Sequence, residues 1–198
     1  MNIFYLDTDP RQCAEWMVDK HVVKMILETA QLLCTAHRVL DGQMIGMTYT
    51  TPDKVISSKF DEETIIIPGK VRSKKVWTLP DSREQILYSA THINHPSAIW
   101  CRQSVENYNW LVDHLFALGD EYTYRYGKKH LTIQKLGYTI QSPPFNLKEW
   151  DWTPMPSCMD RQYIISEDPI TNYRNYYTHG KARMHAWKRR EKPEWMTL

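Results

Sequence analysis

One long stretch without glycine or proline constrains the fold most. After Asp9 and Pro10, the chain runs as far as Asp41 before Gly42 interrupts it. Asp9 can accept hydrogen bonds from the first free N–H groups of a helix, and Pro10 already has the φ of a first helical residue. Gly42 can adopt the left-handed conformation that ends many helices. We therefore predict one helix over residues 9–40.

The middle of this segment combines an apolar surface with one polar line. Its apolar side chains point nearly all round the helix axis, which predicts burial on most sides: Val22, Val23, Met25, Ile26, Leu27, Ala30, Leu32 and Leu33. The polar positions advance by three or four and so share one face: Lys20 or His21, Lys24, Glu28, Gln31 and Thr35. Buried charges are costly to desolvate, so these groups either pair inside the core or line a cleft. A structural Lys24–Glu28 pair and a functional site both fit the pattern.

Length and composition favour a soluble protein of one domain, residues 1–198. The cysteines are far apart, without a C-x-x-C pair, and the histidines are scattered, so we expect reduced thiols and no metal or other cofactor. No apolar run approaches eighteen residues, so we expect no membrane partner and a cytoplasmic location, in a host cell if the chain comes from a phage. The net charge of +2 requires any nucleic-acid affinity to come from a local patch. The oligomeric state stays open.

The remaining segments predict a mainly α-helical protein with a small β-hairpin excursion. Residues 41–80 are rich in β-branched side chains, and Lys70, Arg72, Lys74 and Lys75 there are either solvated or contact phosphate. A short helix is expected over 82–90, and a long one from His95-Pro96 to Gly127 that packs against the first long helix. A further helical piece over 128–138 and an ordered aromatic loop over 141–161 complete the body.

The C-terminal segment, residues 168–198, is basic and aromatic. Asp168-Pro169 repeats the helix-capping signal, and seven Lys or Arg residues follow against two Glu. Tyrosine and tryptophan residues are interleaved with these Lys and Arg residues. Such a composition suits the binding of a phosphate backbone with exposed nucleobases. A segment docked through its aromatic side chains, with solvated charges, is the other interpretation.

Three separated stretches resemble the pyrimidine-dimer DNA glycosylases, the endonuclease V type of T-even phages. They are Asp19-Lys20-His21 with Glu28 seven residues after His21, His95-Pro96 opening an aromatic helix, and the run NYRNYYTHGKAR at 172–183. The resemblance implies a compact helical protein that binds duplex DNA and cleaves the N-glycosidic bond of a damaged base. In that family an N-terminal amine attacks the sugar and a glutamate assists, which assigns Glu28 the role of catalytic carboxylate.

Other site residues follow from the resemblance and from where it departs. Leu27 and Gln31 stand where the family has arginines, and a bulky Asn2 follows Met1. The nucleophile of a covalent step is then the Met1 amine or Lys24, whose pKa a nearby Lys20 could lower; without such a step Glu28 activates water. We expect His21 to orient or exchange protons. Substrate contacts are expected from Gln31, Lys20, His95, Tyr176, Tyr177, Lys181 and Arg183.

These residues leave three functions open. The first is an N-glycosylase acting on a modified or damaged base in DNA, with or without lyase activity. The second is an enzyme that cleaves a free nucleotide or a nucleotide signal on the same scaffold. The third is a nucleic-acid-binding protein without catalysis, in which the polar line of the first helix is structural.

Overall fold

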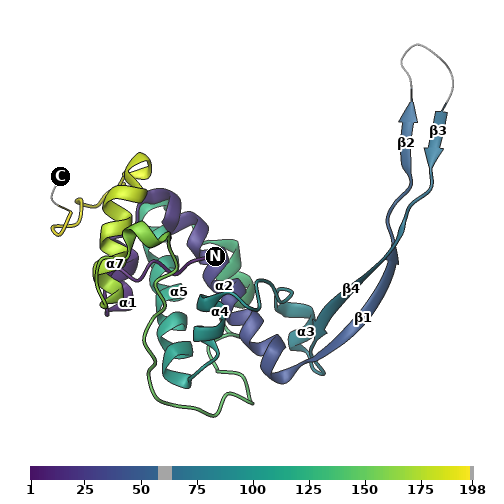
Figure 1. The fold of residues 1–198 in the computed structure, drawn as a ribbon, viewed down its shortest axis with the longest axis horizontal. Coiled ribbons are helices and arrows are strands. Elements are labelled where there is room, and N and C mark those ends of the chain that lie inside the picture. Colours follow the sequence, from purple (N-terminus) through teal and green to yellow (C-terminus); the bar gives the residue numbers. More distant parts are fainter. Residues whose placement is uncertain (58–63, 197–198) are drawn as a thin grey trace.

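The computed structural model describes residues 1–57 and 64–196, which form a mainly helical body and a long β arm (Figure 1). The predicted β-rich region 41–80 includes residues 58–63, and the predicted C-terminal segment includes 197–198; both stretches lie outside the described residues. The helices are α1 (Pro10–Glu15), α2 (Asp19–Asp41), α3 (Arg83–Ile86), α4 (Pro96–Cys101), α5 (Val105–Tyr126), α6 (Leu131–Leu136) and α7 (Pro169–Asn175).

The prediction of one helix over 9–40 is wrong, because the chain breaks between α1 and α2. Asp9 caps α1 through Arg11 N as expected, but the helix ends at Glu15. The break leaves backbone carbonyl groups without a partner inside a helix. The buried Arg125 guanidinium of α5 donates hydrogen bonds to two of them, the oxygens of Glu15 and Met17, at 2.8 and 2.9 Å. Distant groups thus satisfy the backbone at the break, as buried polar groups require.

Helix α2 ends where predicted, but Gly42 is not left-handed. Its φ is −99°, and its N–H bonds the carbonyl of Arg38. Glycine is needed here for space, since a Cβ would lie 2.4 Å from the Arg38 oxygen and 2.5 Å from the Thr78 oxygen. The chain therefore passes directly from α2 into the arm.

The predicted helix over 95–127 is also divided, into α4 and α5. Ser104 ends the break by accepting a hydrogen bond from Asn107 N, an N-cap that its residue type favours. Gly127 has φ of +67° and closes α5 as predicted. The expected helices over 82–90 and 128–138 are shorter, as α3 and α6.

The core lies between α2 and the helices packed against it, α4, α5 and α6. The N-terminal segment adds Ile3 and Leu6, both fully buried, and the loop over 141–161 adds Met155. This loop is held through Trp100, whose Nε1 donates to the Thr153 oxygen at 2.9 Å. The ordered aromatic loop was predicted, because apolar side chains of this density are stable only when packed.

The arm consists of two antiparallel pairs of strands. β1 (Gln43–Thr50) pairs with β4 (Val71–Thr78), and β2 (Lys54–Ser57) pairs with β3 (Thr64–Ile67). The predicted excursion is thus confirmed, although β3 and β4 both belong to its returning half. At the joint between the pairs, Thr51 N donates to the Lys70 oxygen at 3.0 Å. Figure 1 shows the arm rising away from the helical body.

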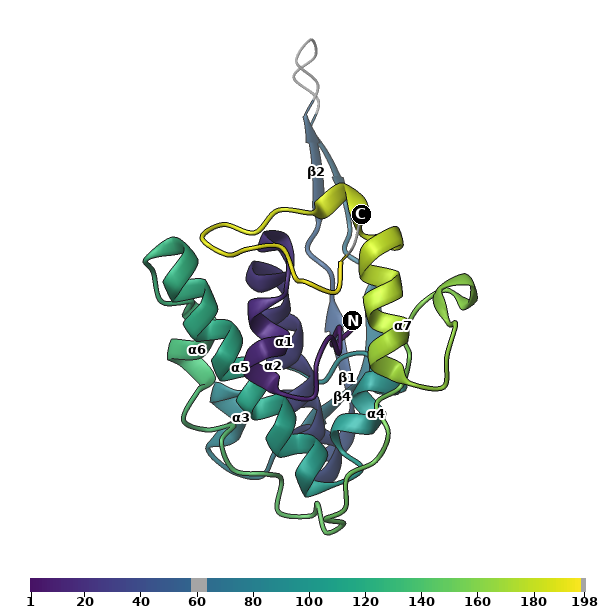
Figure 2. The ribbon, with the colours of Figure 1, turned by 90° about the vertical axis from the view of Figure 1, so that its left-hand side faces the viewer.

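The C-terminal segment returns to the N-terminus. Asp168 caps α7 through the N–H groups of Ile170 and Thr171, as its sequence predicts. Figure 2 shows α7 beside the N-terminal segment, and the rings of Phe4 and Tyr173 lie 6.3 Å apart. None of the described helices is long and apolar enough to cross a membrane.

Replacing Gly42 with alanine should destabilise the fold. The new methyl group meets two backbone carbonyls, which cannot move as a side chain would, so we expect a loss of about 2 kcal/mol or more. Urea unfolding followed by circular dichroism measures this. Gly46→Ala is the matched control, since its Cβ meets nothing within 4 Å; equal losses in both variants would contradict the steric explanation.

Candidate active site

One side of α2 is open to solvent. Val23 and Leu27 are 40% and 41% exposed, so the prediction that they are buried is wrong. Lys20 and Lys24 are exposed beside them, and Glu28 and Gln31 are half-buried. From Lys20 to Gln31 the polar line is therefore part of an open strip, whereas Thr35 at its end is buried.

Glu28 lies between two amines at the edge of this strip. Lys24 Nζ is 2.9 Å from Oε1, and the Met1 amine is 3.9 Å from Oε2. The Glu28 side chain keeps 15% exposure, while that of Lys24 keeps 69%. The pair between Lys24 and Glu28 is thus formed, but it is not closed inside the protein. Of the expected catalytic residues, the structure brings together Glu28, Lys24 and Met1.

The N-terminal segment holds the amine in this place. Asn2 Nδ2 donates to the Cys158 oxygen at 2.6 Å, and Asn2 Oδ1 accepts from Ile3 N at 2.8 Å. Phe4 has φ of +55°, which a bulky residue rarely adopts. Its ring stacks on His21 at 4.2 Å. Asn2 was missed as a site residue, because its anchoring contact comes from a residue 156 positions away.

His95 lies close to the same charges. Its Nδ1 accepts a hydrogen bond from Ser97 N at 3.2 Å as the N-cap of α4, so the proton of the neutral ring is on Nε2. Burial lowers the pKa of His95, and so do the charges of the N-terminal amine and His92, while Glu28 acts in the opposite direction. The ring is neutral at pH 7 and can donate through Nε2.

His21 and Tyr177 support this site from the core. His21 Nδ1 and the Tyr177 hydroxyl are 2.6 Å apart, and both residues are buried. Burial, with the charges of Lys181 and Lys24, lowers the pKa of His21 to about 3. The structure thus buries Tyr177, which was expected to contact substrate, and His21, which was expected to orient or exchange protons, and both rings pack against Phe4.

Tyr176 and Lys181 lie beside the N-terminal segment and remain half-buried. Lys181 Nζ is 4.6 Å from the Tyr176 ring centre and 5.7 Å from that of Phe4. Arg183 is exposed nearby in the sequence. A cation over aromatic faces can bind a base and its phosphate together.

Two of the basic side chains expected to bind nucleic acid, those of Arg174 and Arg190, have structural roles. The Arg174 guanidinium lies over the rings of Trp16 and Trp195, at 5.0 and 5.3 Å from their centres, and donates to the Leu6 oxygen. Arg190 is paired with Glu121 at 2.8 Å. The segment is thus docked on the body, but the charges of these two residues are not merely solvated as the second interpretation expected, because their guanidinium groups pair with groups of the body.

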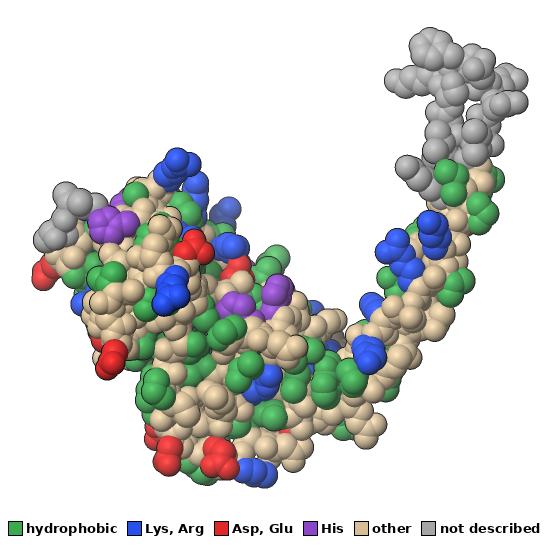
Figure 3. All heavy atoms as spheres, in the orientation of Figure 1, with side chains coloured by type: hydrophobic (Ala, Val, Ile, Leu, Met, Phe, Trp, Pro, Cys, Tyr) green, Lys and Arg blue, Asp and Glu red, His purple; other side chains and the backbone are tan. Residues whose placement is uncertain are grey.

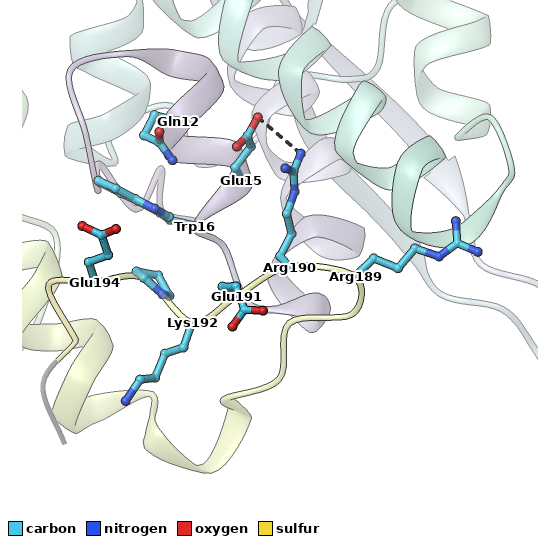
Figure 4. A pocket seen from close by; sticks show the side chains of 9 residues that line it. Gln12, Glu15, Trp16, Arg189, Arg190, Glu191, Lys192 and Glu194 are labelled. Atoms are coloured by element: carbon cyan, nitrogen blue, oxygen red, sulfur yellow. Dashed lines mark ion pairs between the residues drawn. The ribbon is translucent and has the colours of Figure 1, made fainter.

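A cavity of about 640 Å³ lies elsewhere, between α1 and residues 189–194 (Figure 4). It is lined by Gln12, Glu15, Trp16, Arg189, Arg190, Glu191, Lys192, Pro193 and Glu194. Arg190 crosses it to Glu15 at 3.3 Å. No expected site residue lines this cavity, and its charges of both signs suit a contact that closes the C-terminal segment onto α1.

The comparisons with known proteins add no relative: no family model, no curated protein and no solved structure matches the chain. Within residues 1–57 and 64–196, no three His, Cys, Asp or Glu side chains gather as a group that could hold a metal ion.

Stability should fall with pH below about 6.5. His21, His37 and His114 have folded pKa values of about 3, 4 and 4, below the ordinary 6.5, mainly because of burial. Between these values the unfolded chain binds more protons, so acid favours unfolding. Each histidine adds up to about 1.4 kcal/mol per pH unit.

Urea unfolding between pH 7 and 4.5 measures this slope. His21→Phe should lower it by about one proton. An unchanged slope in His21→Phe would show that the buried ring is not the neutral group described above.

Proposed function

We propose that this protein is an N-glycosylase that acts on a modified or damaged base in DNA. The observation that carries the proposal is the Glu28 carboxylate, held at the solvent edge of α2 between the Met1 amine and Lys24. Departure of a base leaves cationic character on the sugar, which a carboxylate stabilises and an amine can trap. α2 and α5, as two long packed helices, would be the scaffold of this chemistry.

The covalent step can be written with these groups. The Met1 ammonium first gives a proton to Glu28, and the neutral amine then attacks C1′ of the sugar. The bond from C1′ to the base breaks, its electron pair leaves with the base, and neutral His95 can donate a hydrogen bond from Nε2 to the departing nitrogen, which takes up the proton that the attached amine then loses. Loss of a proton from the attached amine and protonation of the ring oxygen by Glu28 then open the sugar to an imine.

The Met1 amine can act only in a chain that begins at Met1, whereas Lys24 does not depend on this. Lys24 is closer to Glu28 but 69% exposed, so its charge is well solvated. The side chain of Met1 is only 3% exposed, which fixes its amine better. We therefore assign the Met1 amine as nucleophile and Lys24 as a substrate contact.

A polymer fits this site better than a free nucleotide. Small-molecule sites usually enclose most of the ligand. Glu28 instead belongs to an open strip with Lys20, Val23, Lys24 and Leu27 exposed. Such a strip can lie along a strand, with lysines near phosphate and Leu27 against a base.

Glu28→Gln tests the catalytic role. The amide keeps the shape but cannot accept a proton or balance a cation, so base release should fall on the order of 10³-fold while DNA binding persists. Mass spectrometry of bases released from modified and unmodified DNA measures turnover. Undiminished release by Glu28→Gln contradicts the proposal, and binding without release in either protein favours the non-catalytic alternative.

Borohydride reduction tests the amine. It should trap a covalent adduct between the protein and damaged DNA, with the bond on the peptide that begins with Met1. One extra residue before Met1 should abolish the adduct, whereas Lys24→Gln should keep it. An adduct on Lys24 would exchange the two roles, and base release without any adduct would indicate attack by water.

A further inference from the structure

The β arm exposes both of its faces. Every residue of β1 is exposed, and the outer five residues of β4 are as well. Met44, Ile45, Met47 and Tyr49 are 41–51% exposed, and Val71 is 70% exposed. A two-stranded ribbon without a layer to pack on is marginally stable in water, so exposed apolar side chains of this kind indicate a binding surface.

The charge of the arm over residues 43–53 and 66–78 indicates an anionic partner. Over these residues, the basic residues are Lys70, Arg72, Lys74 and Lys75, and the acidic residue is Asp53. Figure 3 shows Lys and Arg side chains following the arm outward from the body. A second basic arm would repel this surface, whereas a phosphate backbone would attract it.

The strand register gathers two of these bases on one face. Tyr49 is opposite Arg72, and Met47 is opposite Lys74, so all four side chains share a face. Lys74 Nζ is 5.5 Å from the Tyr49 ring centre. Lys75, opposite Gly46, is on the other face. One face thus joins two cations to an apolar and aromatic surface, and the other also carries a cation.

The arm is mounted firmly on the helix that carries Glu28. The buried Arg38 of α2 donates to the Trp77 oxygen in β4 at 2.9 Å and to Glu84 Oε2 at 2.6 Å. From Glu28 to Asp41, α2 rises about 20 Å. Figure 1 shows the arm and the body enclosing an open concave side, with the N-terminus on the face of the body between α7 and the arm.

We propose that the arm lies in the major groove of the duplex whose damaged base is bound at Glu28, with Arg72 and Lys74 on its phosphates. A two-stranded ribbon fits this groove, and β1 spans about 27 Å, enough to follow it. The α2 rise places these contacts several base pairs from the reacting base. This inference rests on the proposed function for the position of the base, but its binding test uses undamaged DNA.

The first test removes the arm without disturbing its base. Met44 and Trp77 are directly opposite, so a two-residue Asn-Gly turn can replace residues 45–76 and leave the Trp77 bond to Arg38 in place. The variant should bind a long undamaged duplex at least tenfold more weakly than the full chain. On a duplex too short to reach the arm, the two proteins should bind equally. Thermal unfolding confirms that the shortened chain folds.

The second test keeps the arm and removes charge. In the Arg72→Ala, Lys74→Ala double variant, the slope of log affinity against log salt should fall by about two, because each phosphate contact adds about 0.9. Lys128→Ala, Lys129→Ala is the matched control, with the same charge change just after α5 and an unchanged slope expected. At moderate salt we expect the arm variant to bind on the order of tenfold more weakly.

Other results overturn the inference. Equal salt slopes in the arm variant and the control would do so, as would a loss of affinity that does not depend on duplex length. A concentration-dependent dimer that disappears with the arm would assign the ribbon to a second copy of the chain. Failure of base release with intact arm-dependent binding would instead reject only the proposed function.

Discussion

The structure depends on the packing of α2, which is covered by α4, α5 and α6 on one side and left open on the other. Polar contacts at three points fix this helix along its length. At its start Asp19 accepts from Arg125 at 2.9 Å, in the middle Glu28 faces Lys24 and Met1, and near its end Arg38 holds the arm. Because both ends and the middle are tied to other segments, α2 gives the N-terminus, the site and the arm one common frame.

The site combines charges that the core alone would not tolerate. An ion pair at the solvent edge avoids the desolvation cost of a buried pair, yet the fixed N-terminal segment keeps the amine near the carboxylate. Neutral His21 contributes by packing, since a charged ring would be costly between Phe4 and Tyr177. Positioning and charge are thus supplied by different residues: the apolar segment positions the amine, and the open strip supplies the charge.

The open strip of α2 and the β arm both expose apolar side chains to solvent. Val23 and Leu27 on α2, like Met47 and Tyr49 on the arm, are apolar groups next to lysines. Such a mixture suits nucleic acid, because its phosphates can contact the lysines and its nucleobase rings or sugars can contact the apolar side chains. An extended substrate that contacts both regions would explain why neither is covered by the protein itself.

The sequence by itself determined the caps at the start of α1 and α7 and at the end of α5, the helical character and the Lys24–Glu28 spacing, because these depend on residues a few positions apart. Asp9, Asp168 and Gly127 act as their residue types predict. Only the tertiary structure decided that α1 and α2 separate at residues 16–18, since Arg125, far along the chain, satisfies the freed carbonyls. It also decided that Leu27 is exposed, that Tyr177 is buried, and that Met1 reaches Glu28. Each of these features depends on which distant segment packs at that place, and a local sequence pattern does not identify that segment.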